Sequence, residues 1–207
     1  MKRAITLTMT LIFVFSCKNK NTAYSKPIKG VEEQSIILPN HPLWVLNRLS
    51  LTKVKEGLNQ TNKQLFILSR TSTTKTAYAS VNNIPVEMGN YYRTSVLVKK
   101  DGLGVSFGLR MIGEYPNRVD AVFDLEKGLI KGVSDVGTFI KGAAKIEDMG
   151  EGWYKCSLIA EVNSNKMKII LGPTSGLGKT ITWEGATNEK SSVHIIPSSL
   201  VLEELAQ

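Results

Sequence analysis

Short runs of alternating apolar and polar residues occupy the chain beyond Pro42, and residues typical of turns separate them. We assign to strands the runs Trp44–Leu49, Gln64–Ser69, Thr76–Val81, Tyr91–Lys100, Val105–Ile112, Arg118–Asp124, Trp153–Glu161, Lys166–Leu171 and Thr180–Glu184. Many short strands with turn signals at near-regular spacing predict an all-β fold, an antiparallel sandwich or barrel. Only Leu200–Ala206 has an apolar spacing compatible with a helix.

The period of two assigns each side chain of a strand to one face of its sheet. The apolar sets expected to face the core are Tyr92, Thr94, Val96 and Val98, then Val105, Phe107, Leu109 and Met111, then Val119, Ala121 and Phe123. The polar positions between them are then predicted to form a charged outer face, because one side of an antiparallel sheet commonly meets water.

The N-terminal segment predicts where the protein resides. Lys2 and Arg3 precede a short apolar run, Ala4–Phe15, that is too short to span a bilayer and is typical of a signal peptide. Val14-Phe15-Ser16-Cys17 resembles the lipobox of bacterial lipoproteins, which implies cleavage before Cys17 and lipidation of its sulfur. A cleaved signal with a chance cysteine is the alternative.

This interpretation divides the chain into three segments and predicts its cellular location. Residues 1–16 are the signal peptide, residues 17–40 are the lipidated cysteine and a flexible polar tether, and residues 41–207 are one β-sandwich domain. The expected location is the bacterial cell envelope, as an outer-membrane lipoprotein facing the periplasm or the cell surface. The lipid on Cys17 is expected to attach the protein to the membrane.

Charge and cysteine content narrow the possible partners. The net charge is +8, but six basic residues precede the first acid, so residues 30–207 carry only +2. No basic stripe suggests nucleic-acid binding. The chain has two cysteines, and if Cys17 carries lipid then Cys156 has no disulfide partner. Cys156 lies in an alternating strand and is predicted to be a small buried hydrophobe.

Five motifs follow one another in an order that resembles a known family. They are Thr94–Lys99, Val122–Gly128, Gly150–Cys156, Gly185-Ala186 with Glu189, and His194–Ser198. Together they resemble the jelly-roll, concanavalin A-like or carbohydrate-binding-like modules of phage tail and bacterial surface proteins. The resemblance covers roughly Trp44 to Ser198 and implies a two-sheet antiparallel jelly roll.

Two tryptophans near these motifs receive structural interpretations. Trp153 is expected to seal the edge of the core where a loop re-enters a strand. Where the family often has tryptophan directly before Gly-Ala, this chain has Glu184, with Trp183 one position earlier. We therefore expect Trp183 to point inward and Glu184 outward, beside Arg93, Lys99 or Arg110.

The outer face and one loop supply the candidate ligand-binding residues. On the outer face they are Arg93, Lys99, Arg110, Asp120 and Glu184, together with Asp124 and Lys155. Tyr115 and Arg118 lie in a loop that contains Pro116, and loops are where binding residues concentrate. Arginine and lysine on such a face can pair with the carboxylates or sulfates of an acidic glycan. The alternative is an ordinary solvated sheet face with cross-strand ion pairs.

Catalytic chemistry has little support in the sequence. His41 and His194 are the only histidines, and no cluster has metal-ligand spacing. Asp120 and Asp124 lie about 13 Å apart along a strand, wider than the ~5–9.5 Å of paired glycosidase carboxylates. We expect no enzyme and no cofactor, and a glycan-binding envelope lipoprotein. The alternatives are an envelope polysaccharide lyase or hydrolase, and a structural or adhesion subunit with a protein partner.

Overall fold

The computed structural model describes residues 22–24, 33–36, 38–39, 43–58, 63–102, 106–175, 179–187 and 189–205. The side chains of residues 22–24, 33–35 and 55–58 are not part of this description. The predicted signal peptide, Cys17, His41 and Val105 lie outside the described residues. Within the described ranges, no helix is both long and apolar enough to cross a membrane.

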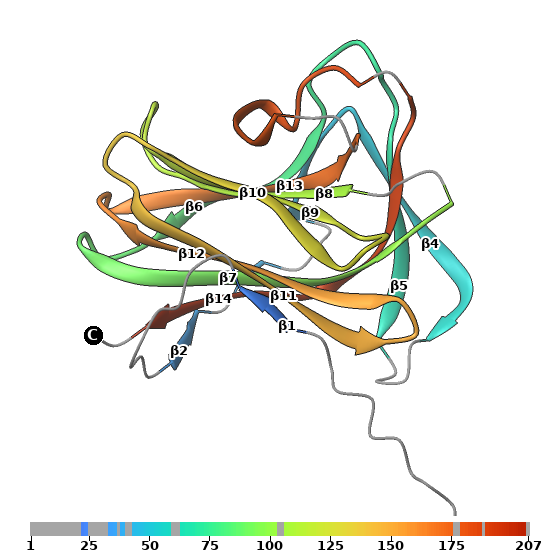
Figure 1. Cartoon of the computed structure of the whole chain (residues 1–207), viewed down its shortest axis with the longest axis horizontal. Helices are drawn as coiled ribbons and strands as arrows, with labels where there is room; N and C mark the ends of the chain where they lie inside the picture. Colours follow the sequence, from blue (N-terminus) through green and yellow to red (C-terminus); the bar gives the residue numbers. More distant parts are fainter. Residues whose placement is uncertain are drawn as a thin grey trace, which may run out of the picture.

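Two antiparallel sheets stack face to face (Figure 1). Among the described residues, the larger sheet contains eight strands in the order β1-β11-β12-β7-β14-β5-β4, with β2 also paired to β14. Their bounds are β1 Thr22–Tyr24, β2 Glu33–Ile36, β4 Leu49–Leu58, β5 Gln64–Arg70, β7 Asn90–Lys100, β11 Ile140–Gly150, β12 Trp153–Val162 and β14 Ser192–Leu205.

The smaller sheet contains six strands in the order β10-β9-β8-β13-β6-β3 within the same described ranges. Their bounds are β3 Val45–Asn47, β6 Tyr78–Pro85, β8 Ser106–Ile112, β9 Arg118–Asp124, β10 Leu129–Val136 and β13 Lys166–Thr174. The protein is an all-β, antiparallel two-sheet jelly roll, which confirms the predicted fold class. We call the side of each sheet that faces away from the other sheet its outer face.

The core lies between the sheets and follows the predicted alternation. Tyr92, Val96 and Val98 of β7 meet Phe107 and Leu109 of β8 in one buried cluster. Cys156 of β12 is fully buried in the same cluster, as predicted. Its burial raises the pKa of the thiol well above its ordinary value.

Two secondary-structure predictions near the C-terminus are wrong. Residues 180–184 form no strand: the chain makes a short 3₁₀ turn, η2 (Thr180–Thr182), which lies beyond the smaller sheet in Figure 1. The described part of the predicted helix, Leu200–Leu205, is not helical, because β14 continues to Leu205. Backbone pairing of this stretch with β7 and β2 overrides its helix-like apolar spacing.

The segment expected to be a tether contributes to the larger sheet. Thr22–Tyr24 pairs with β11, and Glu33–Ile36 pairs with β14. The folded part of the chain therefore includes residues before position 41, where the domain boundary was predicted.

Trp153 does not have the predicted position at the edge of the core. Cys156 and Leu158 of β12 face the core, and the unbroken pairing of β12 with β7 keeps the alternation regular back to residue 153. Trp153 therefore belongs to the outer face of the larger sheet, opposite Lys99. The neighbouring Tyr154 packs against the core instead.

Candidate functional site

The seven predicted ligand-binding residues do not share one outer face. Arg93 and Lys99 belong to β7 of the larger sheet, whereas Arg110, Arg118 and Asp120 belong to β8 and β9 of the smaller sheet. The outer faces of the two sheets point in opposite directions, so the predicted common face is wrong. Each of the two groups must be considered by itself.

On the larger sheet, Arg93 and Lys99 occupy ordinary cross-strand positions. Arg93 Nε lies 2.8 Å from Glu203 Oε2, and the two residues are directly opposite each other on β7 and β14. Lys99 lies between Trp153 and His194 on the neighbouring strands. Asp124 and Lys155, placed near these residues by the sequence, also separate, since Asp124 ends β9 of the smaller sheet.

On the smaller sheet, Arg110 is the centre of a buried polar cluster. Its Nε donates to Asp120 Oδ1 at 2.5 Å, and its Nη1 and Nη2 donate to the two carboxylate oxygens of Glu184 at 2.8 Å each. Nη2 also donates to the Ile181 carbonyl at 2.8 Å. Arg110 is 3% exposed, so this bidentate pair ties the segment after η2 to the sheet. Of the three partners predicted for Glu184, Arg110 is the one observed.

Asp120 is the most perturbed carboxylate of this cluster. It is fully buried, accepts a hydrogen bond from Trp183 Nε1 at 3.0 Å, and lies 3.3 Å from Arg118 Nε. Burial raises the pKa of Asp120 to about 6, although the positive charge of Arg110 opposes this shift. Because no part of Asp120 is exposed, the carboxyl has no access to a substrate in this structure.

Trp183 covers the outer face of the smaller sheet. It is buried, as predicted, but against this outer face with Val122 and Ile170 instead of between the sheets. The indole ring fits against β8 because residue 108 is a glycine. A Cβ atom on Gly108 would lie 2.1 Å from Trp183 Cδ2. The Arg110 guanidinium lies 5.7 Å from the centre of the indole ring. This half of the outer face is thus closed by the chain itself.

The other half of the same face is open and hollowed. Arg118, Ile112 and Lys168 are cross-strand neighbours on β9, β8 and β13, two residues along each strand from the Asp120–Arg110–Ile170 row. A hollow of about 700 Å³ begins there. Its lining residues are Asn82, Asn83, Ile112, Gly113, Glu114, Ser164, Asn165, Lys166, Met167 and Lys168. We call it the sheet hollow.

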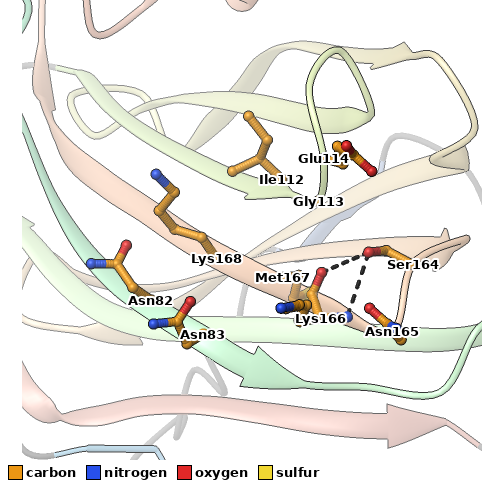
Figure 2. Close-up of a pocket in the computed structure, with 10 residues that line it drawn as sticks. All are labelled: Asn82, Asn83, Ile112, Gly113, Glu114, Ser164, Asn165, Lys166, Met167 and Lys168. Atoms are coloured by element: carbon orange, nitrogen blue, oxygen red, sulfur yellow. Dashed lines mark hydrogen bonds between the residues drawn. The ribbon is translucent and has the colours of Figure 1, made fainter.

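The walls of the sheet hollow come from different elements. Figure 2 shows Ile112 and Glu114 on one side, Asn82 and Asn83 of β6 on the other, and Lys168 between them. Ser164 closes one end, where its Oγ donates to the Lys166 carbonyl at 2.7 Å. The lining therefore combines amide, ammonium, carboxylate and hydroxyl groups with an apolar floor.

Tyr115 lies in the turn that follows Glu114. The turn is closed by hydrogen bonds between residues 113, 114 and 117, and the Tyr115–Pro116 peptide is cis. Tyr115 is 77% exposed, which makes it the most exposed large hydrophobic side chain described. It is thus an exposed aromatic group one residue from the sheet hollow.

The sequence analysis missed the sheet hollow because Asn82, Asn83 and Ser164 lie between the assigned strands and carry turn signals. The remaining lining residues lie largely within assigned strands, and nothing in the sequence joined the two groups. Asn83 has a φ of 56°, which asparagine tolerates in tight turns. The available signal was an excess of amide side chains at the ends of adjacent strands.

Metal-dependent chemistry has no candidate ligand cluster in the described part of the chain. Among the described residues, no group of three or more histidine, cysteine, aspartate or glutamate side chains could hold a metal ion. The described lining of the sheet hollow contains one carboxylate, Glu114. It lacks the pair of carboxyl groups that glycoside hydrolysis ordinarily uses.

Comparison with known proteins finds similarity only at the level of structure. No family model and no curated protein matches the chain. It is similar to the CBM22-1 xylan-binding domain of Paenibacillus barcinonensis Xyn10C, with 12% identity, a TM-score of 0.45, and coverage of 86% of this chain and 96% of that one. It is also similar to the C-terminal CBM6 of LamC, a marine laminarinase from Zobellia galactanivorans, with 11% identity, a TM-score of 0.39, and coverage of 84% and 99%.

A third similar structure is longer than this chain. The CBM22-1 and GH10 modules of Clostridium thermocellum xylanase 10B match with 13% identity and a TM-score of 0.44, and the match covers 82% of this chain and 28% of that one. These neighbours contain carbohydrate-binding modules, and none of the three is more than 13% identical to this chain.

Proposed function

We propose that this protein is a non-catalytic glycan-binding protein and that the sheet hollow is its binding surface. The observation that carries the proposal is an open hollow of about 700 Å³ whose lining mixes amides, lysines and one carboxylate. Sugar hydroxyl groups both donate and accept hydrogen bonds, so side chains of both kinds suit them. Ile112 offers apolar contact for the C–H face of a sugar ring.

The charges of the hollow favour an acidic glycan. Lys166 and Lys168 supply two positive charges, whereas Glu114 supplies one negative charge. Arg118 is the cross-strand neighbour of Ile112, so its strand position adjoins the same surface. Binding that depends on these charges is expected to weaken as salt is added, because exposed charges are screened over about 10 Å at 0.1 M ionic strength. Tyr115 is suitably exposed to stack on a sugar ring at the rim.

A glycan array probed with the purified protein tests this proposal. We expect retention on arrayed acidic polysaccharides, and a loss of at least tenfold in affinity for Lys168→Ala, which corresponds to about 1.4 kcal/mol. Lys99→Ala, on the outer face of the larger sheet, is the matched control and is expected to bind normally. If Lys99→Ala loses binding while Lys168→Ala keeps it, the binding surface lies on the other sheet and the proposal is wrong.

We further propose that the protein is anchored to the bacterial envelope by a lipid on Cys17. The support is the sequence of the first seventeen residues, with its basic start, short apolar run and terminal Ser16-Cys17. One acyl chain gives only marginal membrane affinity, so more than one lipid chain is needed for stable attachment.

Replacing Cys17 with serine tests the anchor. In cells supplied with a labelled fatty acid, the natural protein is expected to incorporate label and to sediment with membranes. Cys17→Ser is expected to carry no label and to leave the membrane fraction or remain unprocessed. An unlabelled natural protein, together with a Cys17→Ser variant that still sediments with membranes, would exclude lipidation. The variant Cys156→Ser controls for labelling of the other cysteine.

A further inference from the structure

A second hollow lies where β4, β5 and β14 meet in the larger sheet. Its volume is about 410 Å³, and its lining residues are Ser50, Ser69, Arg70, Thr71, Lys190, Ser191 and Ser192. Every lining residue carries either a hydroxyl or a positive charge. We call it the serine hollow. It is distinct from the sheet hollow, whose lining shares no residue with it.

Three serines form a row along one wall. Ser50 of β4 is directly opposite Ser69 of β5, and Ser69 is directly opposite Ser192 of β14. Neighbouring strands are about 4.8 Å apart, so the three hydroxyls lie side by side on one face of the sheet. The hydroxyls of Ser50 and Ser69 can donate hydrogen bonds to a ligand, whereas Ser192 already donates to Asp101.

Arg70 also lines the serine hollow, but its side chain lies on the core-facing side of β5, opposite the side of Ser69. It is 2% exposed and donates to five carbonyl oxygens, which belong to Ser72, Lys75, Pro173, Glu184 and Gly185. Within the described ranges no carboxylate lies within ion-pair distance of Arg70. Burial lowers the pKa of Arg70 and the nearby charge of Glu184 opposes this shift. The guanidinium is therefore held by dipoles, and no contacting carboxylate neutralises it.

Ser191 carries an unsatisfied polar atom in this wall. The residue is 4% exposed, and its Oγ has no hydrogen-bond partner among the described residues. A buried hydroxyl without a partner is unfavourable, and most such groups in proteins are satisfied. The adjacent Lys190 is exposed at the mouth of the hollow. One acid is close by: Asp101 accepts a hydrogen bond from Ser192 Oγ at 2.5 Å, but it is not part of the lining.

We propose that the serine hollow binds a small oxyanion, the carboxylate or sulfate group of a ligand. The Lys190 ammonium and the Ser191 hydroxyl would donate to its oxygens, the Ser50 and Ser69 hydroxyls would supply further donors, and Arg70 would contribute its charge from the core-facing side of β5. This site does not depend on the sheet hollow. The two hollows are well separated along β13. Lys168 lines the sheet hollow, whereas Pro173, whose carbonyl accepts a hydrogen bond from Arg70, is five residues further on, or about 17 Å at 3.3 Å per residue.

Backbone amide NMR of the purified protein tests the proposal, with sodium sulfate and sodium glucuronate as probes and sodium chloride at equal ionic strength as the reference. We expect saturable shifts of the amide signals of Thr71, Ser191 and Ser192 with at least one of the two probes and none with chloride. Sulfate alone, or glucuronate alone, would identify which oxyanion fits the hollow.

Two variants decide whether the effect belongs to this hollow. Lys190→Gln and Ser191→Ala are each expected to weaken binding of the probe at least fivefold. Lys168→Gln, in the sheet hollow, is expected to bind the probe normally. The oxyanion proposal can therefore fail without affecting the glycan proposal, and the reverse is also true. Shifts that never saturate, or an unchanged affinity in both variants, would overturn the proposal.

Discussion

Arg110→Ala is expected to lower the free energy of unfolding by about 3–5 kcal/mol at pH 8, the range measured when one partner of a buried ion pair is removed. The substitution leaves Asp120 fully buried without its closest cation, and it frees the Glu184 carboxylate from both of its hydrogen bonds. Unfolding in urea, followed by circular dichroism, measures the loss.

The pH dependence gives this prediction a second readout. The pKa of Asp120 is already raised to about 6 by burial, and loss of Arg110 raises it further because the opposing positive charge is gone. The variant can then protonate Asp120 at mildly acidic pH and avoid burying the charge. We therefore expect a smaller loss at pH 5 than at pH 8.

An exposed ion pair provides the control for Arg110→Ala. Lys100 pairs with Glu126, and both side chains are about half exposed. Lys100→Ala is expected to cost less than about 1 kcal/mol, as is usual for surface pairs. Equal losses for the two variants would show that the Arg110 cluster contributes no more to stability than a surface pair does.

Trp183→Ala is expected to destabilise the protein by about 3–5 kcal/mol, the range for removing a large buried aromatic side chain. The indole is 1% exposed, packs on Val122 and Ile170, and donates to Asp120. Its removal leaves a cavity over Gly108 and removes a hydrogen bond from a buried carboxylate. The same urea unfolding experiment measures the effect.

Trp153 is the matched control, because it is also a tryptophan on the outer face of a sheet but is less buried than Trp183. Trp153→Ala is expected to cost clearly less than Trp183→Ala, since Trp153 is only half-buried. A larger loss for Trp153→Ala would restore the original interpretation of that residue as a seal of the core. It would then contradict the strand alternation seen in β12.

The alternation of apolar residues predicted most of the fold because each strand of the sandwich buries one face. Phe107, Leu109 and Met111 are fully buried between the sheets, as their spacing required. The strands β1, β2, β4, β10, β11 and β14 were missed. Of these, β10 and β11 contain glycines and charged residues that weaken the pattern. Residues 180–184 were misassigned because Ile181 and Trp183 share a parity by chance inside a covering turn.

The candidate site was less predictable, because it depends on which strands join which sheet. The sequence placed Arg93 and Arg110 on one face, and only the strand order separates them. The pairing of Glu184 with Arg110 was among the expected alternatives, but its burial could not be foreseen from one strand pattern. Predicting the burial of this pair requires knowing that Trp183 packs on Gly108, a contact between residues that are 75 positions apart.

The single buried cysteine gives this fold an internal reporter of its own opening. With Cys17 lipidated as proposed, Cys156 is the chain's remaining free thiol. A thiol must reach solvent and ionise before it reacts, and both are blocked while Cys156 is buried in the core between the two sheets. The rate of labelling by a thiol reagent would therefore report how often the core opens at β12, without any engineered probe.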